Sequence, residues 1–313
     1  MHNIMATLTQ DKKTVFLEGL IPNQPVSQKE KNIISDAERH LARLDFPSSK
    51  NEYWKYTGTR RIINQKYSQT PDFKANISLL PVLDDCPNTL VFINGYFSEE
   101  QSEIADEAFI LPLSKAKSQN TKEFLDFFAR INDYKNHIFS AINTVYHTNG
   151  VFINLPEDKQ LQKTQIIFLN TTRQPLFNPR NLFILHTGSS ADISFLNISD
   201  GESGGFCNAV TEIYLKDNSR LNLQNIQNPS ASTHIIHTID VNQEAHTHFK
   251  SFTATFNGDI VRNNLNVHQL ASGCETDLYG FALLSGKTHA DNHTLIEHLH
   301  PHNNSNEWYK YVM

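Results

Sequence analysis

The stretch LHTGSSADI, residues 185–193, decides the fold because it recurs along the second half of the sequence. Similar stretches are LKDNSRLNL from residue 215, VNQEAHTHF from residue 241 and LASGCETDL from residue 270. Each begins with an apolar residue, has a turn residue three positions later and ends on an apolar residue. The turn residues are Gly188, Asn218, Glu244 and Gly273. The starting residues are 30, 26 and 29 positions apart and a weaker copy starts at Leu155, so we infer an internal repeat.

Short β-type runs fill these repeats. From about residue 150 onward, Val, Ile, Thr and Phe are frequent between turn residues, and helical periodicity is absent. A period of this length without a helix is typical of one coil of a β-solenoid, in which each coil packs on the next. An antiparallel β-sandwich is the alternative, because its turns also recur regularly. The chain has 32 Asn and only 12 Gly, which indicates that many turns use Asn, a residue that tolerates left-handed backbone.

The N-terminal half has a different pattern. Residues 27–44 place apolar side chains at helical spacing, and Ser27 with Glu30 forms a potential capping box. Residues 121–146 have a similar apolar stripe, whereas residues 89–96 alternate like a strand and end near an Asn-Gly turn. We therefore predict a mostly helical N-terminal domain with a short strand segment over residues 1–148. A mainly β body, a parallel β-solenoid, is expected over residues 149–313.

Composition limits the classes of protein. The chain has 313 residues with 27 Lys and Arg against 33 Asp and Glu, a net charge of −6, which disfavours a nucleic-acid partner. No apolar run approaches the roughly 20 residues that a membrane helix needs, and the first residues lack the apolar core of a signal peptide. Cys86, Cys207 and Cys274 are far apart in the sequence and form no CxxC motif. They predict a reducing, cytoplasmic location without disulfides.

Motifs for common enzyme chemistry are absent from the sequence. It has no nucleophile elbow, phosphate loop or dinucleotide fingerprint. A β-solenoid carbohydrate-active enzyme stays open as an alternative, but it needs carboxylates clustered on one sheet face. The acidic residues of the β region are scattered: Asp192, Glu212, Asp240, Glu244, Asp259, Glu275 and Asp277. Cys274 follows a glycine in a turn and could be a reactive thiolate, although a single cysteine is more often inert.

Histidine is the strongest chemical signal, with 15 residues in the chain. His298, His300 and His302 alternate, so on an extended strand their imidazoles would lie on the same side. Three converging imidazoles are a reasonable metal site, and a histidine-based metal-binding protein is therefore a further alternative. Pro301 interrupts this run, and alternating histidines are also common as structural or solvated side chains.

A set of motifs near the C-terminus resembles a known family. These motifs are R-N-N at residues 262–264, L-x-x-G-x-x-x-x-L-Y at residues 270–279, D-N-H-T at residues 291–294, and Ser305 four residues before Tyr309-Lys310. Residues 259–313 carrying them resemble the SufB/SufD family of the SUF iron–sulfur cluster assembly machinery. EYWKYT from residue 52, VFINGY from residue 91 and NTVYHTNGVFINLP from residue 143 agree with it. The chain is more similar to SufD than to SufB, because the cysteine motifs expected of SufB are not visible.

The resemblance implies a fold and a role. The family has a helical N-terminal domain, a right-handed parallel β-helix and a C-terminal helical domain. It implies a SufB-like partner and two copies of a SufC-like ATPase. SufD is a non-catalytic scaffold there, supporting cluster assembly and iron acquisition. We therefore expect no enzyme activity and no tightly bound cofactor, with iron or an iron–sulfur cluster present only transiently in the complex.

Four residues of the D-N-H-T motif are expected to have a structural or interface role: Asp291, Asn292, His293 and Thr294. Asp and Asn side chains commonly cap turns, so we predict a turn between coils at this motif. The sequence stops at Met313, where members of the family continue, so we expect the C-terminal part to be missing. Binding of the SufC-like ATPase should then be weakened, and an open coil edge should favour a homodimer.

Overall fold

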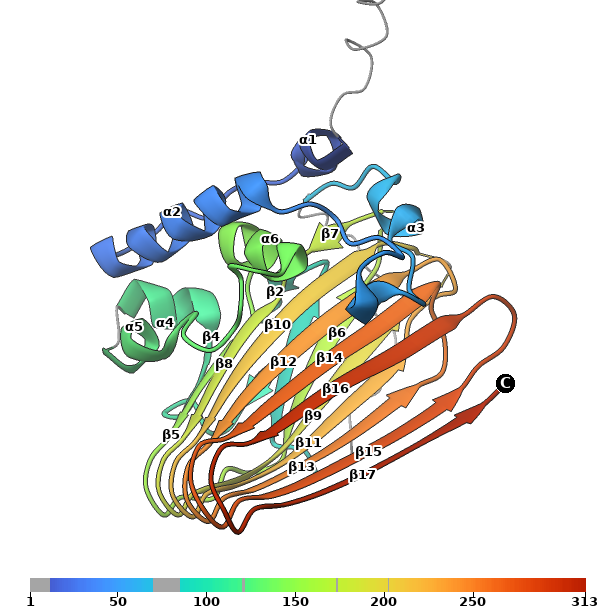
Figure 1. Ribbon diagram of the computed structural model, residues 1–313. Coiled ribbons are helices and arrows are strands. Elements are labelled where there is room, and N and C mark those ends of the chain that lie inside the picture. Colours follow the sequence, from blue (N-terminus) through green and yellow to red (C-terminus); the bar gives the residue numbers. More distant parts are fainter. Residues whose placement is uncertain (1–11, 70–84, 120–121, 173, 202) are drawn as a thin grey trace, which may run out of the picture.

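A parallel β-solenoid of two facing sheets forms the body of the protein, which confirms the predicted mainly β fold (Figure 1). The computed structural model describes residues 12–69, 85–119, 122–172, 174–201 and 203–313. The first sheet contains, in spatial order, β17 (Asn304–Val312), β15 (Glu275–Leu283), β13 (His248–Thr255), β11 (Arg220–Asn228), β9 (Ser190–Ser199), β6 (Thr164–Asn170), β1 (Asn88–Ile93) and β2 (Tyr96–Phe97), with β3 (Glu103–Ile104) beside β1. The second sheet contains β16 (His289–His298), β14 (Ile260–Gln269), β12 (His234–Gln243), β10 (Phe206–Leu215), β8 (Arg180–Leu185), β5 (Val151–Leu155) and β4 (Ile110–Pro112), with β7 (Leu176–Phe177) beside β10. From β8 to β17 the chain alternates between the sheets, so each coil gives one strand to each.

The predicted repeat corresponds to these coils. Leu155 pairs with Leu185 and Leu185 with Leu215, so the weak first copy belongs to the same series. At each corner that leads from the second sheet into the first, the backbone turns through the left-handed region. The residues there and their φ angles are Asp158 (56°), Gly188 (71°), Asn218 (61°), His246 (57°), Gly273 (79°) and His302 (64°). Gly, Asn, Asp and His are the residues that tolerate this conformation best, so the turn composition follows from backbone geometry.

The third and fourth copies begin at other residues than predicted. Gln243, and not Val241, pairs with Leu215 and so occupies the first position of the third copy. The left-handed residue of this copy is His246 and not Glu244. The fourth copy begins one residue earlier, at Gln269. The sequence alignment expected an apolar residue at the first position. Gln243 is polar but is buried there, and its side-chain nitrogen donates to a threonine hydroxyl at 3.2 Å.

The interior of the solenoid changes along its axis. In the earlier coils Phe195 stacks between Phe168 and Phe183, with ring centroids 5.9 and 6.0 Å apart. In the later coils Asn263 donates to the side-chain oxygens of Gln227 at 3.0 Å and Asn292 at 2.8 Å. Apolar packing therefore gives way to hydrogen-bonded amides, which can be buried because they satisfy one another.

Six α-helices and one 3₁₀ helix of the described chain lie on the side of the second sheet (Figure 1). They are α1 (Lys12–Leu17), α2 (Gln28–Arg43), the 3₁₀ helix η1 (Glu52–Trp54), α3 (Arg60–Ile63), α4 (Leu113–Gln119), α5 (Lys122–Phe127) and α6 (Ile138–Tyr146). As predicted, Ser27 caps α2, and its hydroxyl oxygen accepts from the Glu30 N–H at 3.2 Å. The helices bury apolar side chains on outward positions of the sheet, including Leu182, Ile184 and Ile236. No helix in the described ranges is long and apolar enough to cross a membrane.

The predicted helical stretch at residues 121–146 is two helices in its described part, α5 and α6, joined by residues 128–137. Ala129 in this connection has a φ of 56°, which ends a right-handed helix. Its N–H donates to the carboxylate of Glu212 in β10 at 2.8 Å, so a tertiary bond replaces a helical one. An apolar stripe alone could not show this interruption.

The strand segment of the N-terminal half joins the solenoid. The predicted strand is β1, and the predicted Asn-Gly turn connects it to β2 in a hairpin, with Asn94 and Gly95 at φ angles of 49° and 88°. β1 also pairs in parallel with β6, so it extends the first sheet. The boundary predicted between residues 148 and 149 falls between α6 and β5, after strands that already belong to both sheets.

We predict that Asn218→Ala destabilises the protein by about 1 kcal/mol, because the short polar side chain of Asn supports a backbone at a φ of 61° by local polar contacts that Ala cannot make. Asn218→Gly should cost much less, since Gly has no Cβ. The measurement is the free energy of unfolding from urea denaturation. Asn228→Ala, at an exposed position ending β11, is the control. An equal loss in the control and in Asn218→Ala would contradict the role of the turn.

Candidate functional site between the helices and the second sheet

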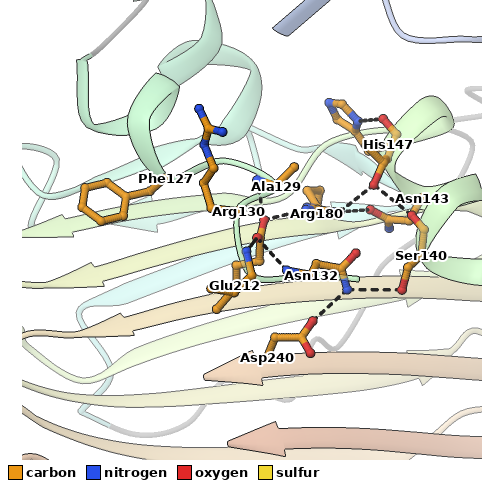
Figure 2. A network of polar contacts seen from close by, with 12 residues as sticks. Phe127, Ala129, Arg130, Asn132, Ser140, Asn143, His147, Arg180, Glu212 and Asp240 are labelled. Carbon is orange, nitrogen blue, oxygen red and sulfur yellow. Dashed lines mark hydrogen bonds and ion pairs between the residues drawn. The ribbon is translucent and has the colours of Figure 1, made fainter. Parts of the chain in front are cut away.

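A buried ion pair lies where the helices meet the second sheet (Figure 2). Arg180 of β8 and Glu212 of β10 both have fully buried side chains, with Nη2 and Oε2 2.5 Å apart. The Glu212 carboxylate also accepts from the backbone N–H groups of Ala129 at 2.8 Å, Ile131 at 3.0 Å and Asn132 at 3.2 Å. These bonds hold the connection between α5 and α6 on the sheet.

The cation of this pair binds α6. Arg180 Nη1 donates to Asn143 Oδ1 at 3.3 Å and to Thr144 Oγ1 at 3.2 Å. Its guanidinium carbon lies 5.0 Å from the centre of the Phe128 ring. Asn143 in turn donates to two sheet carbonyls at 2.8 Å. Removal from water is costly for both charges, and the many bonds to the pair compensate for that cost.

A second carboxylate lies beside Glu212. Asp240 pairs with Glu212 in the register of β10 and β12, and it accepts from Asn132 and Asn266 side chains, both at 2.7 Å. Burial, more than the nearby charge of Glu212, raises the pKa of the Asp240 carboxyl to about 6. Glu212 and Asp240 are both buried and hydrogen-bonded, so a polysaccharide cannot reach this pair.

A cavity of about 440 Å³ lies next to the network. Ser140 connects the two, because it lines the cavity and its hydroxyl oxygen accepts from Asn132 Nδ2 at 3.2 Å. The start of α6 forms one wall, η1 forms a second, and outward residues of β12, β14 and β16 form the floor. Tyr53, Trp54 and Phe139 give the walls an aromatic surface.

Arg262 is the buried cation of this cavity. Its side chain is 2% exposed, its guanidinium carbon lies 4.1 Å from the centre of the Trp54 ring, and its Nε donates to Asn264 Oδ1 at 2.9 Å. Its Nη1 forms an ion pair with Asp291 of β16, and the hydroxyl of Thr57 donates to the same carboxylate. The EYWKYT segment and the D-N-H-T motif, which are far apart in the sequence, therefore meet here.

The turn predicted at the D-N-H-T motif is wrong, because all four residues lie within β16. Asp291 and His293 face outward, and the His293 ring lies 5.1 Å from the Tyr53 ring. Asn292 is bonded to the amide of a neighbouring coil, and Thr294 donates to Glu307 at 2.8 Å. β16 has polar residues on both faces, so its sequence lacks the alternation of apolar and polar residues that identifies a strand. The interface role of these residues stays a prediction.

The three histidines predicted as metal ligands lie at the end of β16 and in the turn after it. His298 Nε2 is 3.1 Å from the Ser305 hydroxyl, His300 follows in the turn, and His302 is that turn's left-handed residue. Within the described ranges, no three or more His, Cys, Asp or Glu side chains are grouped to hold a metal ion. The structure thus does not bring these three imidazoles together, and the metal-binding hypothesis stays a prediction.

The cysteines are free thiols. Cys274 is buried, and its Sγ donates to the carbonyls of Glu244 at 3.1 Å and Ala271 at 3.2 Å. Burial raises the pKa of the Cys207 thiol far above its usual value, and burial also raises the pKa of Cys86. The environments of Cys207 and Cys86 therefore disfavour a thiolate.

Two family models match adjacent parts of the chain. Residues 25–167 match the SufBD protein N-terminal region, and residues 168–313 match the SufBD core domain of SUF system FeS cluster assembly. The chain belongs to the SufBD family. The two SufBD models meet inside β6, after the first strands of the solenoid.

Individual SufBD relatives are distant in sequence. The chain is 22% identical over 292 residues to an iron–sulfur cluster assembly SufBD family protein of Synechocystis, covering 87% of this chain and 64% of that protein. It is 24% identical over 314 aligned positions to protein ABCI7, chloroplastic, of Arabidopsis thaliana, covering 95% and 65%. It is 25% identical over 163 residues to the iron–sulfur cluster assembly protein SufD of Plasmodium berghei, covering 52% and 12%. The chain spans just under two thirds of the first two relatives.

The sequence analysis missed the Arg180–Glu212 pair and the cavity. Both charged residues stand in runs that are mostly apolar, R-N-L-F-I-L and T-E-I-Y-L. A charge at an outward position of a strand whose other outward residues are apolar is the one signal that could have indicated a buried pair. The 30-residue spacing of Leu185 and Leu215 places Arg180 and Glu212 on neighbouring coils, but it does not show that helices cover both side chains.

We predict that Arg180→Met lowers the free energy of unfolding by about 3 to 5 kcal/mol, because Glu212 would stay buried without its cation. Adding Glu212→Gln should recover part of this loss, since the unpaired charge is then absent and the amide oxygen can still accept from the backbone N–H groups of the connection. Lys122→Met, in an exposed pair with Asp126, is the control and should have almost no effect. Urea denaturation measures all three. An Arg180→Met protein as stable as the wild type would contradict the structural role of the pair.

The raised pKa of Asp240 predicts a pH effect. Between the usual pKa of 3.8 and about 6, the folded state keeps a proton that the unfolded state releases. This contribution to stability is therefore present at low pH and is lost as pH rises through about 6. As the pH rises from 4 to 7, the unfolding free energy of Asp240→Asn should therefore increase by up to about 3 kcal/mol relative to that of the wild type. Parallel pH profiles of unfolding free energy for the two proteins would contradict this.

Proposed function

We propose that the protein is a non-catalytic scaffold subunit of the SUF machinery. In this proposal it pairs with a SufB-like subunit and acts with a SufC-like ATPase in cluster assembly and iron acquisition. The observation that carries the proposal is the SufBD family match over residues 25–313. The names of its relatives in Synechocystis and Plasmodium berghei, which refer to iron–sulfur cluster assembly, support the same role.

The chemistry of the charged residues agrees with a scaffold. The buried charged residues Arg180, Glu212 and Asp240 are hydrogen-bonded to neighbouring protein groups and are not exposed to solvent. Their bonds fix the helices to the solenoid. We propose that iron or a cluster is transient cargo of the complex and that the chain works in the cytoplasm, where its free cysteines stay reduced.

The first sheet offers a surface for the SufB-like subunit. Phe252 of β13, Tyr279 of β15 and Trp308 of β17 are paired in register and form an outward row, the aromatic row. Phe252 is 37% and Trp308 61% exposed. Neighbouring exposed aromatic side chains are typical of protein interfaces. We therefore propose that the partner binds the aromatic row.

Purification of the tagged chain from its own host, followed by mass spectrometry, tests the function. We expect a SufB-like protein to be recovered, and a SufC-like ATPase to a smaller extent. Recovery of neither would contradict the scaffold role. A homodimer stays a prediction, and light scattering at high concentration should detect it.

The aromatic row has its own test. Phe252→Ala with Trp308→Ala should reduce recovery of the SufB-like protein at least tenfold, as loss of two buried aromatic anchors does at protein interfaces. Tyr56→Ala, an 81% exposed tyrosine on the helical side, should leave recovery unchanged. Equal recovery with both variants would place the interface elsewhere without contradicting the scaffold role.

A further inference from the structure

The start of α6 presents unused donors to the cavity beside it. The backbone N–H groups of Ile138, Phe139 and Ser140 donate to no described residue, and the side chain of His137 does not cap the helix. All four residues line the cavity. The first N–H groups of a helix and its dipole together favour a negative group at this end.

Arg262 supplies a second, independent donor from the floor of the cavity. Its Nε and Nη1 are bonded to Asn264 and Asp291, but its Nη2 donates to no described residue. The side chain is almost fully buried, and it lines the cavity. A guanidinium nitrogen held in this way is pre-positioned for a carboxylate or phosphate oxygen. Asp45, the acidic residue among those lining the cavity, is exposed at its rim.

The remaining walls suit a flat apolar group. The rings of Trp54, Tyr53 and Phe139 line the cavity, and the Trp54 ring is fixed by its contact with Arg262. Aromatic walls favour a ring that stacks on them. The volume, about 440 Å³, is within the range of pockets that hold small organic ligands.

We propose that this cavity binds a small aromatic anion, a planar ring carrying one carboxylate or phosphate. The anionic group lies between the N–H groups of α6 and Arg262 Nη2, and the ring packs against the aromatic wall that Tyr53 and Trp54 form. The site is separate from the aromatic row, so it does not depend on the scaffold function.

Tryptophan fluorescence tests the proposal directly. The chain has two tryptophans, so Trp308→Phe leaves Trp54 as the only one. Titration of this protein with phenyl phosphate and with benzoate should give a saturable change, and the stronger of the two identifies the preferred anionic group. Phenol, which lacks the anion, and inorganic phosphate, which lacks the ring, should each bind at least about tenfold more weakly.

Variants in the same background test the walls. Arg262→Lys, which keeps the charge but loses Nη2, should weaken binding about tenfold or more. Tyr53→Ala, at a 65% exposed residue, should also weaken binding and should not affect folding. Tyr56→Ala, three residues further along the same segment, should leave it unchanged. Circular dichroism verifies that each variant is folded.

Two results would overturn the proposal. One is the absence of a saturable Trp54 signal with either aromatic anion at millimolar concentration. The other is equal affinity for phenol and phenyl phosphate, which would show that the cavity is an apolar pocket without an anion site. If Arg262→Lys does not fold, the comparison of Tyr53→Ala with Tyr56→Ala still decides whether the ring binds in this cavity.

Discussion

The buried pair of Arg180 and Glu212 is the interaction on which the arrangement of this protein depends. A charge removed from water needs a full set of partners, and this pair obtains them from the sheet, from α6 and from the connection before α6. The connection therefore cannot continue α5 as a helix. α6 must begin where it does, and its first N–H groups are then left facing a cavity. The position of the cavity thus follows from the ion pair.

Sequence alone was sufficient for the architecture because the architecture is periodic. Leu155, Leu185 and Leu215 occupy one position in successive coils, and left-handed turns select Gly, Asn, Asp and His. The pattern failed at Gln243, where a buried amide satisfies its own hydrogen bonds and replaces an apolar residue. A pattern of hydrophobic residues cannot detect a polar residue that is buried in this way.

The site could not be predicted because its residues come together only through the fold. Arg180 and Glu212 are 32 positions apart, and Thr57 and Asp291 are 234 positions apart. The repeat brings Arg180 and Glu212 to neighbouring coils but gives no sign of the helices that bury them, and Thr57 lies outside the repeat altogether. The D-N-H-T motif was correctly noticed as unusual but was assigned to a turn, because the polar residues of β16 face both the cavity and the amide-filled interior. The family resemblance, by contrast, rested on local motifs and needed no such distances.

The left-handed turns have a consequence for how such a chain can change in evolution. Five positions separate Gln243 from His248 in one coil. Their pairing partners in the next coil, Gln269 and Glu275, are six positions apart. The extra residue is absorbed in the turn, and the strands on both sides keep their pairing. Insertions and deletions at these corners therefore leave both sheets intact, whereas the same change within a strand would turn its interior side chains outward. The connections at the opposite edge also differ in length, with seven positions from Gln227 to His234 and five from Thr255 to Ile260 in the next coil, so both edges of the solenoid absorb length changes.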